Sequence, residues 1–267
     1  MSYLNKQDVD KNVTKVSLDA KSLYQTSIDI IIPYYNQYNS VLRSIRSIFS
    51  VPTKHKIKII LVDDHSENVS FLENFENNKY VDGYRMPQRS GFGASVNFGL
   101  KKCESPWILV CHSDIEASHT GWIDNLIESI LNWKKVDDSV KMVSACTNIV
   151  PDDVDSSLKR SNVMEGKDFI LDSHSPFYAT LFHRDLPKHI GGNLFKEYPI
   201  AWYEDIELSS RMKYYGYKQS GSSKSFVRHY GGLTINALLS SQEGGQIGKT
   251  MESNYQKCTE DVNNYHI

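Results

Sequence analysis

The stretch Ser27–Asn36 reads SIDIIIPYYN and decides the fold. Its apolar, β-branched centre predicts a buried strand over 28–32 that ends at the proline, because proline lacks the backbone N–H that a strand uses. Apolar residues then recur with helical spacing over 41–49, and Asn39 or Ser40 is placed to cap that helix. A strand, a loop and a helix in this order form the first half of a β-α-β unit.

The same pattern repeats along the chain. Further strands are predicted over 57–62, 107–111, 140–149 and 177–182, and further helices over 67–75, 91–102, 122–133 and 202–215. Strands that alternate with helices predict an α/β fold with a mostly parallel central sheet flanked by helices. We expect one domain over 27–235, a polar N-terminal segment over 1–26, and a C-terminal tail over 236–267 that acts as a lid, joins subunits or stays disordered.

Composition narrows the class of protein. The 267 residues carry 30 Lys and Arg against 32 Asp and Glu, a formal charge of −2, so electrostatics alone attracts no nucleic acid. No apolar run approaches the roughly 18 residues of a membrane-spanning helix, and residues 1–27 have no apolar core for secretion. Four widely spaced cysteines are expected to be reduced thiols. These features predict a cytoplasmic protein without a transmembrane segment, free in solution or peripheral to a membrane or assembly.

Polar clusters directly follow three of the predicted strands. They are Pro33–Asn36, Asp63–Asp64 and His112–Asp114. Ligands of an open parallel sheet bind beyond the carboxyl ends of its strands, where the loops and helix N-termini converge. Each cluster alone is also explained by turn formation. Three clusters at the same edge of the sheet predict a binding crevice.

Several motifs occur in a fixed order between residues 27 and 234, and together they resemble glycosyltransferase family 2. The motifs are Ile30–Asn36, Leu61–Ser66, the segment from Gly91 through Asn97 to Gly99, an aspartate after a strand, and Glu204-Asp205 with Arg211 downstream. The resemblance implies a GT-A (Rossmann-like) fold. It also implies an inverting transfer of a sugar from a nucleotide-diphosphate sugar, with a UDP-sugar expected, to the hydroxyl of a glycan or another acceptor, as in polysaccharide biosynthesis.

The resemblance also implies the donor-binding residues. Aromatic rings near the first loop can stack on the base, and a carboxylate can accept a hydrogen bond from a pyrimidine N–H. Arg89 is a candidate partner for base or phosphate, with a solvated surface arginine as the alternative. The implied donor-binding set is Pro33, Tyr34, Tyr35, Asn36, Asp63, Asp64, Arg89, Gly91, Asn97 and Ser113.

The family's metal motif, Asp-x-Asp, is altered here. His112 stands at its first position, so the resemblance implies Asp114 as the direct ligand, and His229 resembles the late histidine that completes such sites. Carboxylate, imidazole and phosphate ligands suit Mn²⁺ or Mg²⁺. The alternative for His229 is an ordinary packed histidine.

The pair Glu204-Asp205 matches the family's acidic pair, which implies that Asp205 is the general base and Glu204 its catalytic neighbour. The alternative explanation is that both acids compensate the positive end of the helix that starts here. Two other functions stay open: a non-catalytic nucleotide-sugar or glycan-binding module, and a sugar nucleotidyltransferase, although the first loop has no glycine or lysine. We expect acceptor contacts from residues 151–175 and from the tail, and a homo-oligomer is open.

Overall fold

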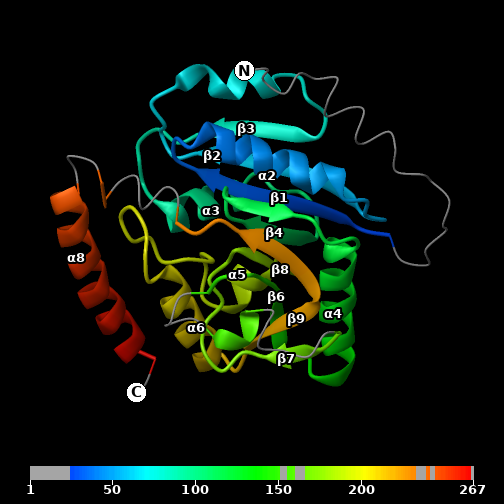
Figure 1. The fold of residues 1–267 in the computed structure, drawn as a ribbon. Coiled ribbons are helices and arrows are strands. Elements are labelled where there is room, and N and C mark those ends of the chain that lie inside the picture. Colours follow the sequence, from blue (N-terminus) through cyan, green and yellow to red (C-terminus); the bar gives the residue numbers. More distant parts are fainter. Residues whose placement is uncertain (1–24, 151–154, 160–165, 233–238, 241–243, 266–267) are drawn as a thin grey trace.

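The computed structural model describes residues 25–150, 155–159, 166–232, 239–240 and 244–265. A single mixed sheet runs through the molecule in the strand order β3-β2-β1-β4-β8-β6-β9-β5, with β7 paired to β9 (Figure 1). Its strands are β1 (Ser27–Tyr34), β2 (Lys56–Asp63), β3 (Val81–Arg85), β4 (Trp107–Cys111), β5 (Ile115–Ala117), β6 (Val140–Cys146), β7 (Asp168–Ile170), β8 (Ala179–His183) and β9 (Lys218–His229).

The predicted α/β class is confirmed. Strands β3, β2, β1 and β4 are parallel neighbours, as are β6 and β9, whereas β8 runs antiparallel between β4 and β6. The parallel neighbours place the carboxyl ends of β1, β2 and β4 at one edge of the sheet. The polar clusters that follow these strands therefore begin at the same edge.

Helices cover both faces of the sheet, and the isoleucines of β1 pack in the cores on both sides. Ile28, Ile30 and Ile32 pack in one core with α2 (Tyr38–Ser50) and α4 (Trp122–Val136). Ile31 faces the second core. Alternate residues of a strand point to opposite faces, so a run of isoleucines supplies both cores. The remaining helices are η1 (Val69–Phe75), α3 (Phe92–Leu100), η2 (Ser156–Leu158), α5 (Leu186–His189), α6 (Glu204–Tyr214) and α8 (Gly244–Asn263).

Two element boundaries differ from the sequence predictions. Strand β1 continues through Pro33, which lies opposite Val62 of β2. Strand β4 pairs with β1 only as far as Ile31, so the missing N–H of the proline removes no bond to β4. Helix α2 is preceded by Gln37 in the left-handed conformation, with a φ of 50°, and not by Asn39 or Ser40, which lie inside the helix.

The segment after β2 also differs, since a 3₁₀-helix over Val69–Phe75 forms where an α-helix over 67–75 was predicted. The side chain of Asn68 accepts the N–H of Ser70 and caps η1. Ser66 instead donates its own N–H to the buried Asp63. The hydroxyl of Ser66 also accepts the N–H of Asn36, and so ties the first two loops together.

The C-terminal part of the chain contains a 20-residue helix, α8, that packs beside α6 (Figure 1). Its buried residues are Ile247, Asn254 and Cys258. Among the helices that the structure describes, none is long and apolar enough to cross a membrane. The predicted N-terminal segment lies outside the described residues up to residue 24, as do parts of the 151–175 segment where acceptor contacts were expected.

Candidate functional site

A cavity of about 710 Å³ opens at the carboxyl ends of β1, β2 and β4. The loop after each of these strands contributes to its wall, through Pro33–Tyr35, Asp64 and His112–Asp114. The start of α6 and the end of β9 close the other sides, through Glu204, Asp205 and His229 in particular. The cavity therefore has the predicted position and brings together residues that lie up to 218 positions apart in the chain, from Pro33 to Met251.

One wall combines an aromatic ring, a cation and a buried carboxylate. The guanidinium of Arg89 lies 4.1 Å from the ring centre of Tyr35. Asp64 accepts the backbone N–H groups of Ser90 at 2.7 Å and of Gly91 at 2.9 Å. Burial raises the pKa of the Asp64 carboxyl, and these two N–H groups act in the opposite direction. This wall offers stacking surface and hydrogen-bonding groups of both kinds.

Gly91 is required here by close packing. Its φ is 95°, and a Cβ atom at this position would lie 2.6 Å from the carbonyl oxygen of Ile200. Only glycine fits such a close backbone approach at a positive φ. The loop that carries Ser90 and Gly91 is thus fixed against the segment before α6.

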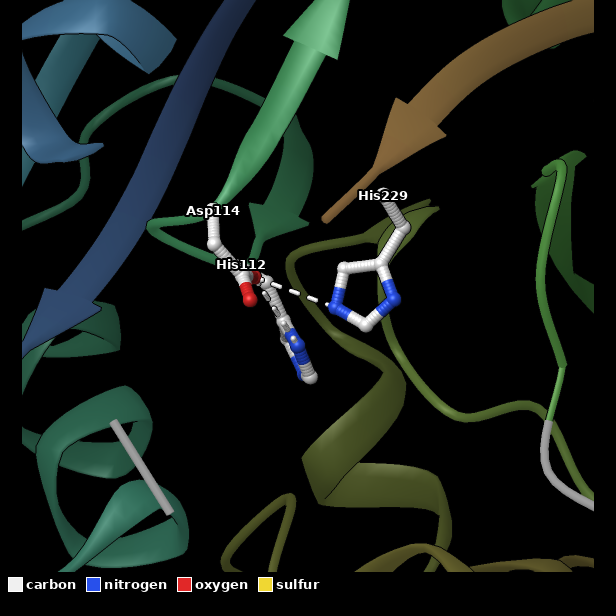
Figure 2. A group of neighbouring side chains, drawn as sticks. All are labelled: His112, Asp114 and His229. Atoms are coloured by element: carbon white, nitrogen blue, oxygen red, sulfur yellow. Dashed lines mark ion pairs between the residues drawn. The ribbon is translucent and has the colours of Figure 1, made fainter. Parts of the chain in front are cut away.

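Three potential metal ligands converge at a second wall. Figure 2 shows His112 and Asp114 on the loop after β4 and His229 at the end of β9. His229 Nε2 lies 3.1 Å from Asp114 Oδ1, His112 Nδ1 lies 3.9 Å from the same oxygen, and one ligand atom from each residue falls within 4.8 Å of the others. Two imidazoles and one carboxylate form a donor set that fits a divalent transition metal such as Mn²⁺.

The surroundings hold both imidazoles in place and favour the neutral form of His112. Tyr178 stacks on His229 with ring centres 3.9 Å apart. Burial, followed by the nearby His229, lowers the pKa of His112 to about 4. Neither ring nitrogen of His229 makes a hydrogen bond within the described part of the chain, although Nε2 points at Asp114. The lowered pKa of His112 and the two buried ring nitrogens of His229 that make no hydrogen bond both suit metal ligation, which needs an unprotonated imidazole nitrogen.

The first turn of α6 forms the wall that carries the acidic pair. The side chain of Asp205 is 26% exposed, and its Oδ2 lies 3.6 Å from Nε2 of the buried His174. The other ring nitrogen of His174, Nδ1, lies 3.1 Å from the hydroxyl of Ser173. Asp205 and Asp114 therefore line the same cavity, with a carboxylate on each wall.

Glu204 differs from its neighbour Asp205. It is only 4% exposed, and burial raises the pKa of its carboxyl to about 8 although the N–H of Gly93 bonds to it. A carboxyl with this pKa holds its proton at neutral pH. Asp205, whose side chain is more exposed, is therefore the better candidate for an ionised base.

Three of the predicted donor-binding residues lie outside the cavity wall. The side chain of Asn36 accepts the hydroxyl of Tyr38 and the N–H of Glu67. Asp63 is fully buried and pairs with Arg85. The side-chain amide of Asn97 bonds the backbone of Phe195 in both directions, and so joins α3 to the segment before α6. These three side chains bond to the segments around the cavity and do not themselves line it.

The other predicted residues line the cavity: Pro33, Tyr34, Tyr35, Asp64, Arg89, Gly91, Ser113, Asp114, Glu204, Asp205 and His229. Sequence reasoning did not name His112 as a potential metal ligand beside Asp114 and His229, although its place at the first position of the altered Asp-x-Asp motif was a signal. It also missed His174 and Met251. His174 lies in the 151–175 segment where acceptor contacts were expected, but nothing in the sequence singles it out.

The chain is similar to known proteins in sequence and in fold. The family model described as Glycosyl transferase family 2 matches residues 29–186. A comparison with curated protein sequences gave no match. The solved structures with a similar fold include GalNAc-T7 with UDP, GalNAc and Mn²⁺, at 16% identity and a TM-score of 0.62, covering 76% of this chain and 44% of that one.

Two further structures share the fold. The mannosyltransferase PcManGT from Pyrobaculum calidifontis, in complex with GDP-Man and Mn²⁺, has 15% identity and a TM-score of 0.56, covering 84% of this chain and 63% of that one. S. aureus TarS 1-349 in complex with UDP-GlcNAc has 16% identity and a TM-score of 0.56, and the match covers 76% of this chain and 58% of that one. The chain thus spans between 44% and 63% of the length of these three proteins.

Proposed function

The chain belongs to glycosyl transferase family 2, and from this premise we propose that it transfers a sugar from a nucleotide-diphosphate sugar to a hydroxyl acceptor with inversion at the anomeric carbon. The observation that carries the proposal is the shared cavity, which has metal ligands on one wall and Asp205 on another. We also propose that residues 27–235 form the catalytic unit. The proteins with a similar fold were solved with UDP, GDP-Man or UDP-GlcNAc, which supports a nucleotide sugar as the donor.

The nucleoside is proposed to bind the wall formed by Tyr35, Asp64 and Arg89. The Tyr35 ring offers a stacking face, and the Arg89 guanidinium beside it offers planar N–H donors to base or phosphate. Asp64 holds the loop of Gly91 and keeps acceptor capacity on its oxygens. The base therefore lies near β1 and β2, and the diphosphate extends toward the loop after β4.

The diphosphate is proposed to lie next to His112, Asp114 and His229. These three residues would hold a divalent cation, which supplies Lewis-acid stabilisation of the leaving nucleoside diphosphate when bound. The two imidazoles favour Mn²⁺ over Mg²⁺, since Mg²⁺ prefers an all-oxygen shell. Tyr178 keeps the ring of His229 oriented by stacking on it.

Asp205 is proposed to act as the general base. Its carboxylate accepts the proton of the acceptor hydroxyl as that oxygen bonds to the anomeric carbon, and the bond from that carbon to the diphosphate oxygen breaks on the opposite face. The N-terminus of α6 favours the ionised form of this carboxylate. A single displacement of this kind inverts the anomeric centre without a covalent intermediate.

The test is a panel of nucleotide sugars incubated with the protein and Mn²⁺, with release of nucleoside diphosphate as the readout. We expect slow release from one donor and faster release once a hydroxyl acceptor is present. Asp205→Asn should remove the acceptor-stimulated rate, whereas Asp138→Asn, a matched change of an exposed aspartate with 65% side-chain exposure, should leave it unchanged. Tight nucleotide binding with no release from any donor would instead identify a binding module.

A further inference from the structure

The five residues before α6, Pro199–Tyr203, hold an unusual backbone conformation at the cavity wall. Ile200, Trp202 and Tyr203 have φ values of 70°, 78° and 76°. This left-handed region is costly for residues with a Cβ atom, and most costly for a β-branched one such as isoleucine. All three residues line the cavity, and Tyr203 directly precedes the acidic pair. Strain of this kind persists only where the surroundings fix the backbone.

Helix α8 fixes this backbone through one buried side chain. Asn254 is 2% exposed, and its Nδ2 donates hydrogen bonds to the carbonyl oxygens of Pro199 and Ala201, each at 2.9 Å. Both hydrogens of one amide group are thus used on two carbonyls of the strained segment. One turn further along α8, the thiol of Cys258 lies 3.7 Å from the carbonyl oxygen of Tyr203.

The opposite side of the segment is held by the loop before α3. The N–H of Phe92 donates to the carbonyl oxygen of Ile200 at 3.1 Å, and Gly91 packs directly against the same peptide. The segment is therefore fixed between α3 and α8. Helix α3 packs against β1 and β2 of the central sheet. Of the two contacts that hold the segment, only the one from α8 can therefore be removed without disturbing the sheet.

Helix α8 is itself anchored to the residues on both sides of the segment. Asp261 accepts hydrogen bonds from Lys196 Nζ at 2.6 Å and from the hydroxyl of Tyr198 at 2.8 Å. The hydroxyl of Tyr265 donates to Glu207 of α6 at 2.6 Å. These contacts fix the position of Asn254 relative to the start of α6.

We propose that Asn254 is a positioning residue, which holds Pro199–Tyr203 in its strained conformation, with three of the five residues left-handed, and thereby sets the direction of Asp205 in the cavity. The inference rests on the proposed function for the role of Asp205. It assigns a task to the C-terminal helix, which lies beyond the region that the family model matches. Without the two amide hydrogen bonds, the segment relaxes toward ordinary backbone angles and the first turn of α6 rotates with it.

The first test is amide hydrogen exchange on Asn254→Leu, which keeps the side-chain size and removes both donors. We expect exchange to become about tenfold faster or more in residues 199–206 and at Phe92, because a local opening needs less free energy once these bonds are lost. Asn263→Leu, an exposed position on the same helix, is the matched control and should leave this exchange unchanged. Should Asn254→Leu fail to fold, Asn254→Ser, with a single donor, should give an intermediate increase. Unchanged exchange in a folded variant overturns the proposal.

The second test separates positioning from general stability. At saturating donor and acceptor, kcat for transfer should fall about a hundredfold in Asn254→Leu, the loss expected for a displaced catalytic group. The dissociation constant for UDP with Mn²⁺ should stay within about twofold, because Tyr35, Asp64 and Arg89 follow β1, β2 and β3, and the hydrogen bonds from Ser90 and Gly91 to Asp64 do not involve Asn254. An equal loss of UDP binding, or faster exchange with unchanged kcat, overturns the positioning role.

The two proposals fail in different ways. If the wild-type protein binds nucleotide sugars and transfers none, the proposed function fails. The exchange result on Asn254→Leu then decides alone whether α8 holds the strained segment. If the wild-type protein transfers sugar and Asn254→Leu matches it in both exchange and kcat, the further inference fails and the proposed function stands.

Discussion

Glu204→Gln should make the protein less sensitive to alkaline pH. Glu204 is almost fully buried, and burial raises the pKa of its carboxyl from 4.5 to about 8. The folded state therefore keeps this proton to higher pH than the unfolded state does. The contribution of this group to the free energy of unfolding is fully present below pH 4.5 and is lost as the pH rises toward 8. In that range the unfolded state releases the proton of Glu204 while the folded state still binds it, so rising pH favours unfolding.

The magnitude follows from the difference between the two pKa values. Each pH unit in the window between 4.5 and 8 changes the free energy of unfolding by about 1.4 kcal/mol, so the whole window corresponds to an upper bound of about 5 kcal/mol. Glutamine has the same shape, stays neutral at every pH and can accept the N–H of Gly93 as the glutamate does. The variant therefore loses this particular pH dependence and keeps the packing.

The assay is urea unfolding of both proteins at half-unit steps from pH 5 to pH 8.5. Stability differences between them cancel the contributions of all other titrating groups. We expect near-equal stability at pH 5 and an advantage for Glu204→Gln that grows with pH, by at most about 1.4 kcal/mol per pH unit, and levels off near pH 8. Glu73→Gln changes an exposed glutamate and should follow the wild-type protein throughout. Parallel stability curves for Glu204→Gln and wild type would refute the account of Glu204 as a buried, proton-carrying acid.

Three further predictions concern the cavity and its support. Arg89→Met should weaken UDP binding about tenfold in calorimetry, because it removes the cation from the Tyr35 ring; unchanged affinity would place the nucleotide elsewhere. His112→Asp should raise transfer with Mg²⁺ relative to Mn²⁺, since a carboxylate replaces an imidazole in the donor set; an unchanged metal preference would exclude His112 as a ligand. Arg85→Met should lower the free energy of unfolding by about 3 kcal/mol, because the fully buried Asp63 loses its ion-pair partner; a change below 1 kcal/mol would show that this pair is not needed.

The sequence predicted the strands that build the site, because their apolar runs are short, β-branched and bounded by polar turns. It also predicted that the three following loops meet at one edge of the sheet. The sequence did not show which of the two neighbours, Asp63 and Asp64, lines the cavity. Neighbouring side chains at a strand end point to opposite sides, and here Asp64 lines the cavity while Asp63 turns inward to Arg85.

Other features depend on contacts far along the chain, which no local pattern reports. Asn97 bonds the backbone of Phe195, 98 positions away, and that partner cannot be found from residue spacing. Helix α8 was expected only as a tail, since its composition is polar. Its buried positions, Ile247, Asn254 and Cys258, nevertheless follow helical spacing, and this weak signal could have predicted a helix with one buried face.

The central claim is that one cavity holds a cation-bound diphosphate on one wall and a base for the acceptor on another. Its most direct test measures UDP affinity with Mn²⁺ by calorimetry, together with the rate of sugar transfer, in Asp114→Asn and Asp205→Asn. We predict that Asp114→Asn loses the Mn²⁺-dependent part of the UDP affinity. Asp205→Asn should bind UDP as the wild-type protein does and lose transfer by about a hundredfold or more. Transfer at the wild-type rate in Asp205→Asn, or Mn²⁺-dependent affinity unchanged in Asp114→Asn, would contradict the account.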